Sequence, residues 1–330
     1  MNDHLSIALA TQLISLAPVA SASAVDVRRP EVRAFIEETS REFGIARDHI
    51  ESLIAQAETK QAILDAISRP AERVVPWYEY RERFLTEKRI LQGADFWVQH
   101  AEALRRIPDP NVAASVVGIL GVETSFGRIT GRFRVIDALA TLAFDYPPRS
   151  DFFRSELQQF LLLSREEAVD PKTALGSYAG AMGAPQFISS SYRNYAIDGD
   201  GNGKRDLWNS WDDVIGSVAN YLSVYGWREG EPVVVTATLA SDDLSRFNTA
   251  KLELNETVRS LRDKGVRFET SLPADAPALL IVAQGKDGPV YRVGFTNFYV
   301  LTRYNRSPMY AMAVHDLGQA VVNFMRDATR

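Results

Sequence analysis

The chain has 330 residues, of which 46 % are hydrophobic and 24 % are charged. This composition excludes a disordered or fibrous protein, and the length suffices for two or three subdomains. The net charge of −5 gives no support to a nucleic-acid partner, which would favour a basic surface. Cysteine is absent, which excludes disulfides, thiolate metal sites and lipid attachment through an N-terminal cysteine.

The first residues resemble a targeting segment. Residues 5–24 form an apolar run that ends in small residues, and Ala22-Ser23-Ala24 fits a signal-peptidase site. We therefore expect a signal peptide over residues 1–24 and a soluble mature protein in the periplasm. Residues 1–4 lack the usual positive charge, so either the start codon is annotated too late or the signal is a poor one. A buried N-terminal helix is the alternative.

Apolar residues at three- and four-residue spacing predict a mainly helical chain. The helical pattern runs from Pro30 to about Ser68 and is followed by a joint rich in proline and arginine. Asp109-Pro110-Asn111 is a helix-start signal. The other predicted helical stretches cover residues 78–85, 93–107, 134–143, 151–168, 211–225 and 308–327.

A small mixed region precedes the last helix. Residues 231–239, 277–284 and 290–295 have the pattern of strands, and the last two are joined by a turn at residues 285–288. A helix is expected among them over residues 253–266. The fold class is therefore mainly α (α+β).

One acid falls on an apolar helix face. In the helix that begins near Asn111, Glu123 lies on the same stripe as Val112, Val116, Ile119 and Leu120. Burial disfavours the charged carboxylate and should raise its pKa, so Glu123 could act as a general acid. The alternative is a structural glutamate bonded to nearby backbone or to Arg128 or Arg132.

A second stretch, Gly176 to Ala196, combines small residues with Ser177, Tyr178, Gln186 and Tyr192. Small residues let the backbone approach a ligand closely, and the polar groups suit a sugar. A tight packed turn followed by a helix cap is the alternative. The sequence has no G-x-S-x-G, H-E-x-x-H or P-loop motif, and its four histidines show no ligand spacing.

Together, "GVETSFG", "GSYAGAMGAPQF", "DALATLAFDYP" and "NFYVLTRYNRSPMYAMAV" resemble the membrane-bound lytic transglycosylase B family, from about Pro30 to the C-terminus. The resemblance implies peptidoglycan cleavage by a lysozyme-like core. It divides the chain into a helical region (25–110), the catalytic core (111–228), a mixed α/β region (229–295) and a C-terminal segment that returns to the core (296–330).

The resemblance also assigns residues. Glu123 matches the family's catalytic acid, and Ser177 matches a serine that orients the substrate N-acetyl group. Arg149 matches one of two basic residues that contact the peptide stem, and Pro148 replaces the other. The remaining matches line the substrate site: Met182, Gln186, Tyr221, Tyr304, Asn305, Tyr310 and one of Tyr78 and Tyr80.

The mechanism implied by the resemblance uses Glu123 as the single general acid and base, without a catalytic cofactor. It cleaves the MurNAc–GlcNAc β-1,4 bond and leaves 1,6-anhydromuramyl ends. A hydrolytic muramidase and a non-catalytic peptidoglycan-binding protein on the same fold are the alternatives. We expect peptidoglycan strands and cell-wall synthesis proteins as partners, no nucleic acid, and a monomer.

The segment that begins at Asp198 predicts a structural calcium site. Asp198, Asp200 and Asn202 alternate, and the Lys204 carbonyl and Asp206 follow, as in the first half of an EF-hand. The twelfth position is an asparagine, so the resemblance implies a longer loop over residues 198–213, closed by Asp213 or its neighbour Asp212. A capping box, Ser210-x-x-Asp213, is the alternative.

Overall fold

The structure is a computed structural model that describes residues 23–68, 75–241 and 243–328. Most of the expected signal peptide, residues 1–22, lies outside the described residues. Helices dominate, which confirms the mainly α class. The described chain belongs to two compact units. The first contains residues 75–126, 215–241 and 243–328, and the second contains residues 23–68 and 127–214.

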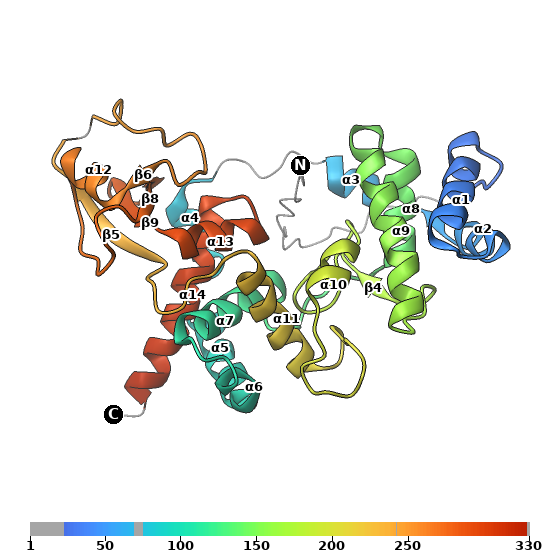
Figure 1. Cartoon of the computed structure of the whole chain (residues 1–330), viewed down its shortest axis with the longest axis horizontal. Coiled ribbons are helices and arrows are strands. Elements are labelled where there is room, and N and C mark those ends of the chain that lie inside the picture. Colours follow the sequence, from blue (N-terminus) through green and yellow to red (C-terminus); the bar gives the residue numbers. More distant parts are fainter. Residues whose placement is uncertain (1–22, 69–74, 242, 329–330) are drawn as a thin grey trace. The chain divides into compact units, whose positions relative to one another are not determined.

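The second unit consists of helices (Figure 1) and of two small antiparallel ladders, β1 with β2 and β3 with β4. Its helix α8 is almost completely buried and packs against α9, so this pair forms the centre of the unit. Its elements are β1 (Ser23–Ala24), α1 (Pro30–Phe43), α2 (Arg47–Ala55), β2 (Glu58–Thr59), α3 (Gln61–Ser68), β3 (Phe133–Arg134), α8 (Val135–Asp145), the short 3-10 helix η1 (Pro147–Arg149), α9 (Ser150–Glu166), β4 (Leu175–Gly176) and α10 (Ser189–Tyr195).

The first unit combines helices with a five-stranded sheet (Figure 1). Helix α11 starts in the second unit and continues into the first. The elements are α4 (Trp77–Glu82), α5 (Glu87–Gln99), α6 (Ala101–Arg105), α7 (Pro110–Thr124), α11 (Trp211–Val224), β5 (Val234–Leu239), β6 (Glu256–Thr257), α12 (Val258–Asp263), β7 (Val266–Arg267), β8 (Pro277–Gln284), β9 (Pro289–Gly294), α13 (Thr296–Tyr304) and α14 (Pro308–Ala328).

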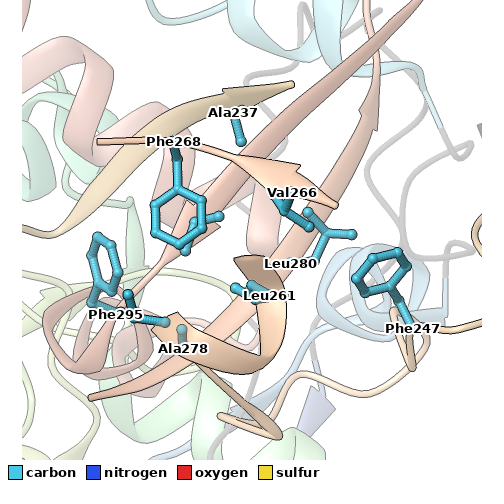
Figure 2. Packing of buried hydrophobic residues seen from close by; sticks show 10 residues of the cluster. Ala237, Phe247, Leu261, Val266, Phe268, Ala278, Leu280 and Phe295 are labelled. Atoms are coloured by element: carbon cyan, nitrogen blue, oxygen red, sulfur yellow. The ribbon is translucent and has the colours of Figure 1, made fainter. Parts of the chain in front are cut away.

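The five-stranded sheet has its own hydrophobic core. Its strand order is β6-β8-β9-β5-β7, with all pairs antiparallel, and Val293 of β9 faces Val235 of β5 and Leu280 of β8. Figure 2 shows Leu261 of α12 packed among Val266, Leu280 and neighbouring side chains. The mixed α/β region is therefore held by apolar packing between the sheet and α12.

Helices α7 and α14 approach each other closely because each carries a glycine at the contact. A Cβ added at Gly118 would lie 2.1 Å from the carbonyl oxygen of Val314, and one at Gly318 would lie 2.2 Å from that of Ala114. The paired positions run in opposite directions, so the two helices are antiparallel. This register sets the last turn of α7 against the first turn of α14.

Most helices after residue 130 agree with the sequence predictions. The stretches 134–143, 151–168, 211–225 and 308–327 correspond to α8, α9, α11 and α14, with small differences at the ends. The strand predicted over residues 277–284 is β8. Helices α10 and α13 were not predicted.

The helix predicted over residues 253–266 is wrong in its first part. Residues 256 and 257 form β6, and α12 starts only at Val258. The Thr257 side chain accepts a hydrogen bond from the Ser260 N–H, and the Ser260 side chain accepts one from the Thr257 N–H, which fixes the helix start here. Gly265, with a φ of +87°, follows the end of the helix.

The described helices include none that is both long and apolar enough to cross a membrane.

Candidate active site

Glu123 lies in the last turn of α7 and is 8 % exposed. The helix begins at Asp109, whose carboxylate accepts a hydrogen bond from the Asn111 N–H at 2.8 Å, with Pro110 in the first turn. It ends at Ser125, which has a left-handed φ of 52°. Because the helix is buried on nearly all sides, its last turn carries the carboxyl group into the interior, as the apolar stripe predicted.

The Glu123 carboxyl is bonded to a tyrosine from the other end of the chain. The hydroxyl of Tyr310, in the first turn of α14, donates to Oε1 of Glu123 at 2.7 Å. Both side chains are buried, with exposed fractions of 8 % and 2 %. The antiparallel packing of α7 and α14 therefore builds the centre of the site.

The electrostatics of Glu123 are those of an acid that can hold its proton near neutral pH. Burial raises the pKa of Glu123 from an ordinary value of 4.5 to about 7, and the Tyr310 hydrogen bond opposes this rise. The pKa values of Tyr310 and Tyr304 are raised well above the ordinary range by burial and by the Glu123 charge. Both tyrosines are therefore neutral hydroxyl donors beside the acid.

Further tyrosines extend from this pair within the first unit. The ring of Tyr304 lies 6.5 Å from that of Tyr310 and 4.8 Å from that of Tyr221, measured between centroids. The Tyr221 hydroxyl donates to the carbonyl oxygen of Arg303 at 2.7 Å. The buried Asn305 follows Tyr304 directly in the chain. Tyr310 thus bonds to Glu123 directly, and Tyr304, Tyr221 and Asn305 follow from it along the first unit.

Of the two tyrosines at the start of α4, Tyr80 is the one that faces this cluster. Tyr80 is 6 % exposed and contributes to the raised pKa of Tyr310 through its charge. The Tyr78 hydroxyl instead donates to its neighbour Glu79 at 3.1 Å at the surface. Of the two candidates, Tyr78 and Tyr80, the structure therefore favours Tyr80.

Three predicted substrate residues lie in one tight loop of the second unit. The Ser177 hydroxyl oxygen accepts N–H bonds from Ala179 at 3.3 Å and Ala181 at 3.1 Å. Met182 is fully buried in the same turn. Gln186 has a left-handed φ of 54°, and its amide nitrogen donates to the Gly183 carbonyl oxygen at 2.9 Å. The strained backbone at Gln186 is held in place by its own side chain.

Arg149 lies at the end of η1 in the second unit. Its guanidinium carbon is 4.3 Å from the ring centroid of Phe152 and 5.6 Å from that of Phe153. The two rings therefore hold the cation in a defined orientation through cation–π contacts.

The acidic loop gathers three carboxylates. Oxygens of Asp198, Asp200 and Asp213 lie within 4.8 Å of one another. Asp213 is fully buried and accepts N–H bonds from Gly199 at 2.8 Å and Asp206 at 2.7 Å, so it closes the loop. Three converging carboxylates fit a hard cation such as Ca²⁺.

The other predicted ligands of the loop have local partners. The Asp206 carboxylate accepts bonds from the N–H groups of Trp208 and Asn209, both at 2.9 Å. The Asn202 side chain accepts from the Lys204 N–H at 2.9 Å. Their role as metal ligands stays a prediction, as does the EF-hand assignment.

Comparisons with known proteins identify the family. The family model described as Transglycosylase SLT domain matches residues 28–319. The chain belongs to this family. It is 38 % identical over 307 residues to membrane-bound lytic murein transglycosylase B of Escherichia coli (strain K12), and the match covers 88 % of this chain and 82 % of that protein.

Solved structures of lytic transglycosylases have the same fold. Soluble lytic transglycosylase SltB1 from Pseudomonas aeruginosa matches with a TM-score of 0.86 and 48 % identity, over 90 % of this chain and 99 % of that chain. Slt35 from E. coli, in complex with calcium, matches with a TM-score of 0.78 and 36 % identity, over 91 % and 96 %. SltB3 from P. aeruginosa, in complex with NAG-anhNAM-pentapeptide, matches with a TM-score of 0.77 and 31 % identity, over 88 % and 78 %. The chain is therefore a lytic murein transglycosylase that acts on peptidoglycan, with the lysozyme-like fold of this family.

This SLT-domain transglycosylase also has buried polar residues that the sequence did not single out as functional. Asp109 Oδ2 accepts bonds from the Trp227 indole N–H at 3.0 Å and the Gly230 N–H at 3.1 Å. The Asn297 side chain accepts from the Arg228 N–H at 2.7 Å and donates to its carbonyl oxygen at 2.8 Å. These bonds tie the start of α7 and the start of α13 to the same segment, residues 227–230. Asp109 was predicted as a helix cap, but spacing along the chain gave no sign of partners more than a hundred residues away.

Proposed function

We propose that this transglycosylase cleaves the β-1,4 bond between MurNAc and GlcNAc without water and forms 1,6-anhydromuramyl ends. Glu123 serves as its single general acid and base. The observation that carries the proposal is the buried Glu123 carboxyl, whose pKa of about 7 leaves it protonated in a large share of molecules at neutral pH. The complex of the related SltB3 with NAG-anhNAM-pentapeptide supports the same chemistry.

In the first step Glu123 gives its proton to the glycosidic oxygen. The bond from C1 of MurNAc to that oxygen breaks, and GlcNAc leaves with a free hydroxyl. The acetamido oxygen of MurNAc stabilises the positive charge that develops at C1. The Tyr310 hydroxyl, 2.7 Å from Oε1, stabilises the carboxylate that Glu123 becomes.

In the second step the Glu123 carboxylate accepts the proton of the C6 hydroxyl of MurNAc. The C6 oxygen then forms the new bond to C1 and closes the anhydro ring, which restores the protonated acid. One carboxyl suffices for both steps because the substrate supplies the nucleophile, whereas most glycosidases use two. A pKa near neutrality suits a group that must both give and accept a proton.

The substrate contacts proposed here are those that the family resemblance assigned. Tyr304 and Asn305 hold the sugar ring beside Glu123, and Ser177 orients the N-acetyl group. Arg149, fixed against Phe152, contacts the peptide stem. The other proposed substrate contacts are Met182, Gln186, Tyr221, Tyr310 and Tyr80.

The acidic loop is proposed to bind one structural Ca²⁺ through Asp198, Asp200 and Asp213, with Asn202, Lys204 and Asp206 as further candidates. The calcium complex of the related Slt35 supports this assignment. The ion would stiffen the loop that follows Gln186 and takes no part in the reaction. We also propose export to the periplasm, which a reporter fusion to residues 1–24 would test.

The proposal is tested by mass spectrometry of digested peptidoglycan. Anhydro ends are lighter than reducing ends by one water, so the dominant product distinguishes transglycosylation from hydrolysis. Glu123→Gln keeps the side-chain shape and removes the acid, and it should lower the rate about 10²–10⁴-fold. Reducing ends as the main product would instead support a hydrolytic muramidase, and full activity of Glu123→Gln would refute the role of the acid.

A further inference from the structure

A row of tyrosine rings leads away from Glu123 within the first unit. It starts with Tyr310, which is nearly parallel to Tyr304, with 13° between the ring planes. Tyr304 contacts Tyr221, and Tyr221 contacts Tyr225, with 4.5 Å between the last two centroids. Tyr225 directly follows the end of α11 and is half-buried. The row therefore connects the buried acid to a partly exposed edge of the unit.

Arg303 lies at the far end of this row. Its guanidinium carbon is 5.7 Å from the ring centroid of Tyr225 and 5.9 Å from that of Tyr299. Tyr299 lies four residues earlier on α13 and thus on the same helix face. The Tyr221 hydroxyl holds the Arg303 backbone through its carbonyl oxygen. The cation is thus fixed by two rings and by its own backbone.

The Arg303 charge has no carboxylate partner among residues 23–68, 75–241 and 243–328, although the side chain is half-buried. Arg292 of the same unit differs, because Asp316 pairs with it through two bonds of 2.6 and 2.8 Å. Cation–π contacts use the faces of a guanidinium, whereas its N–H donors point outward in the plane. The edge of Arg303 therefore remains available to a planar acceptor, and a carboxylate matches it best.

We propose that Arg303, held between Tyr225 and Tyr299, binds a carboxylate of the peptidoglycan substrate and so sets a preference for charged muropeptide strands. The inference rests on the proposed function, because the tyrosine row starts at Glu123. Peptidoglycan offers carboxylates on its stem peptides and, where a stem has been removed, on the lactyl group of MurNAc. A purely structural clamp between α11 and α13 is the competing explanation.

The test compares two forms of one soluble glycan preparation. In one form the stem carboxylates are intact, and in the other they are converted to neutral amides. For the wild type, amidation should raise KM about tenfold with little change in kcat, as expected for the loss of a charge-assisted hydrogen bond at a half-exposed site. Arg303→Gln should lose most of this discrimination, and Arg303→Lys should recover part of it. The discrimination that remains in Arg303→Gln belongs to the stem contact proposed for Arg149.

Arg259→Gln is the matched control, because it removes an exposed arginine on α12 of the same unit. It should leave KM on both forms unchanged. The discrimination by the wild type should also weaken as salt is added, because a half-exposed ion pair is screened. Strands freed of stems by an amidase separate the two carboxylate sources. If the wild type and Arg303→Gln still differ in KM on these strands, Arg303 binds the lactyl carboxylate. If their KM values become equal, Arg303 binds a stem carboxylate.

Equal KM values of the wild type on charged and amidated strands would overturn the inference. So would an Arg303→Gln variant whose KM rises by the same factor on both forms, because a structural clamp acts on every substrate alike. In both cases anhydro products that still depend on Glu123 would leave the proposed function standing. Conversely, activity that does not depend on Glu123 would remove the proposed function, whatever Arg303 does.

Discussion

Removing one hydroxyl should shift the pH range in which the transglycosylase works. In Tyr310→Phe the ring that packs beside Glu123 remains, but the 2.7 Å hydrogen bond to Oε1 is lost. That bond favours the charged carboxylate and so lowers the pKa of Glu123, against the larger effect of burial. Its removal should therefore raise the pKa above the value of about 7 in the wild type.

The size of the shift follows from the two protonation states. A hydrogen bond to a charged group contributes roughly 1.5–3 kcal/mol, and one between neutral groups roughly 0.5–1.5 kcal/mol. The protonated acid can still accept the weaker bond, so the difference between the states is about 1.4 kcal/mol, or about one pKa unit. Because Glu123 must be protonated to start the reaction, the alkaline limb of kcat/KM should move upward by about one pH unit.

The assay is the pH dependence of kcat/KM on soluble glycan strands, with the products separated by chromatography. Tyr291→Phe is the control, because it makes the same chemical change on β9, where the ring packs against the core of the sheet. The alkaline limb of the kcat/KM profile of Tyr291→Phe should coincide with that of the wild type. A Tyr310→Phe limb that stays in place or moves to lower pH would refute the proposed coupling between this hydroxyl and the acid.

Three further predictions follow from the same contacts. Burial of Glu123 should make the wild-type free energy of unfolding fall by about 3 kcal/mol as pH rises from the ordinary pKa of 4.5 to about 7. In urea titrations Glu123→Gln should lack this fall. The same dependence of unfolding free energy on pH in both proteins would contradict the prediction. Gly118→Ala places a Cβ 2.1 Å from the Val314 carbonyl oxygen, so it should destabilise by about 1–3 kcal/mol and reduce activity; unchanged stability would disprove the tight helix contact. Calcium should raise the Tm of the wild type relative to chelator, and Asp200→Asn should reduce this rise by removing a charge from the cluster; a Tm of the wild type indifferent to calcium would exclude the ion.

The burial of Glu123 could be predicted from the local sequence, but its hydrogen-bond partner, Tyr310, could not. The apolar run predicted that Glu123 is buried, and the structure confirms this burial, although α7 is buried on nearly all sides and not on one face alone. Its bond to Tyr310 spans 187 residues and depends on the close packing of α7 and α14 at Gly118 and Gly318. No periodicity encodes such a register, so Tyr310 came from the family resemblance alone.

The acidic loop shows a similar division. Alternating oxygens predicted Asp198 and Asp200, which the structure gathers with Asp213. Position nine of the motif also suggested Asp206. Its carboxylate instead accepts hydrogen bonds from the N–H groups of Trp208 and Asn209. Aspartate often forms such local turns, and residue spacing does not distinguish them from a ligand. The predicted helix over residues 253–266 was too long because the cap at Thr257 was missed.

The central claim is that one buried carboxyl drives a cleavage in which the sugar, and not water, attacks C1. Digestion in water enriched in the heavy oxygen isotope tests this most directly, with mass spectrometry of the muramic ends. The account predicts anhydro ends without heavy oxygen from the wild type, and formation of these ends about 10²–10⁴-fold more slowly by Glu123→Gln. Heavy oxygen at C1 of the main product, or undiminished anhydro formation by Glu123→Gln, would contradict it.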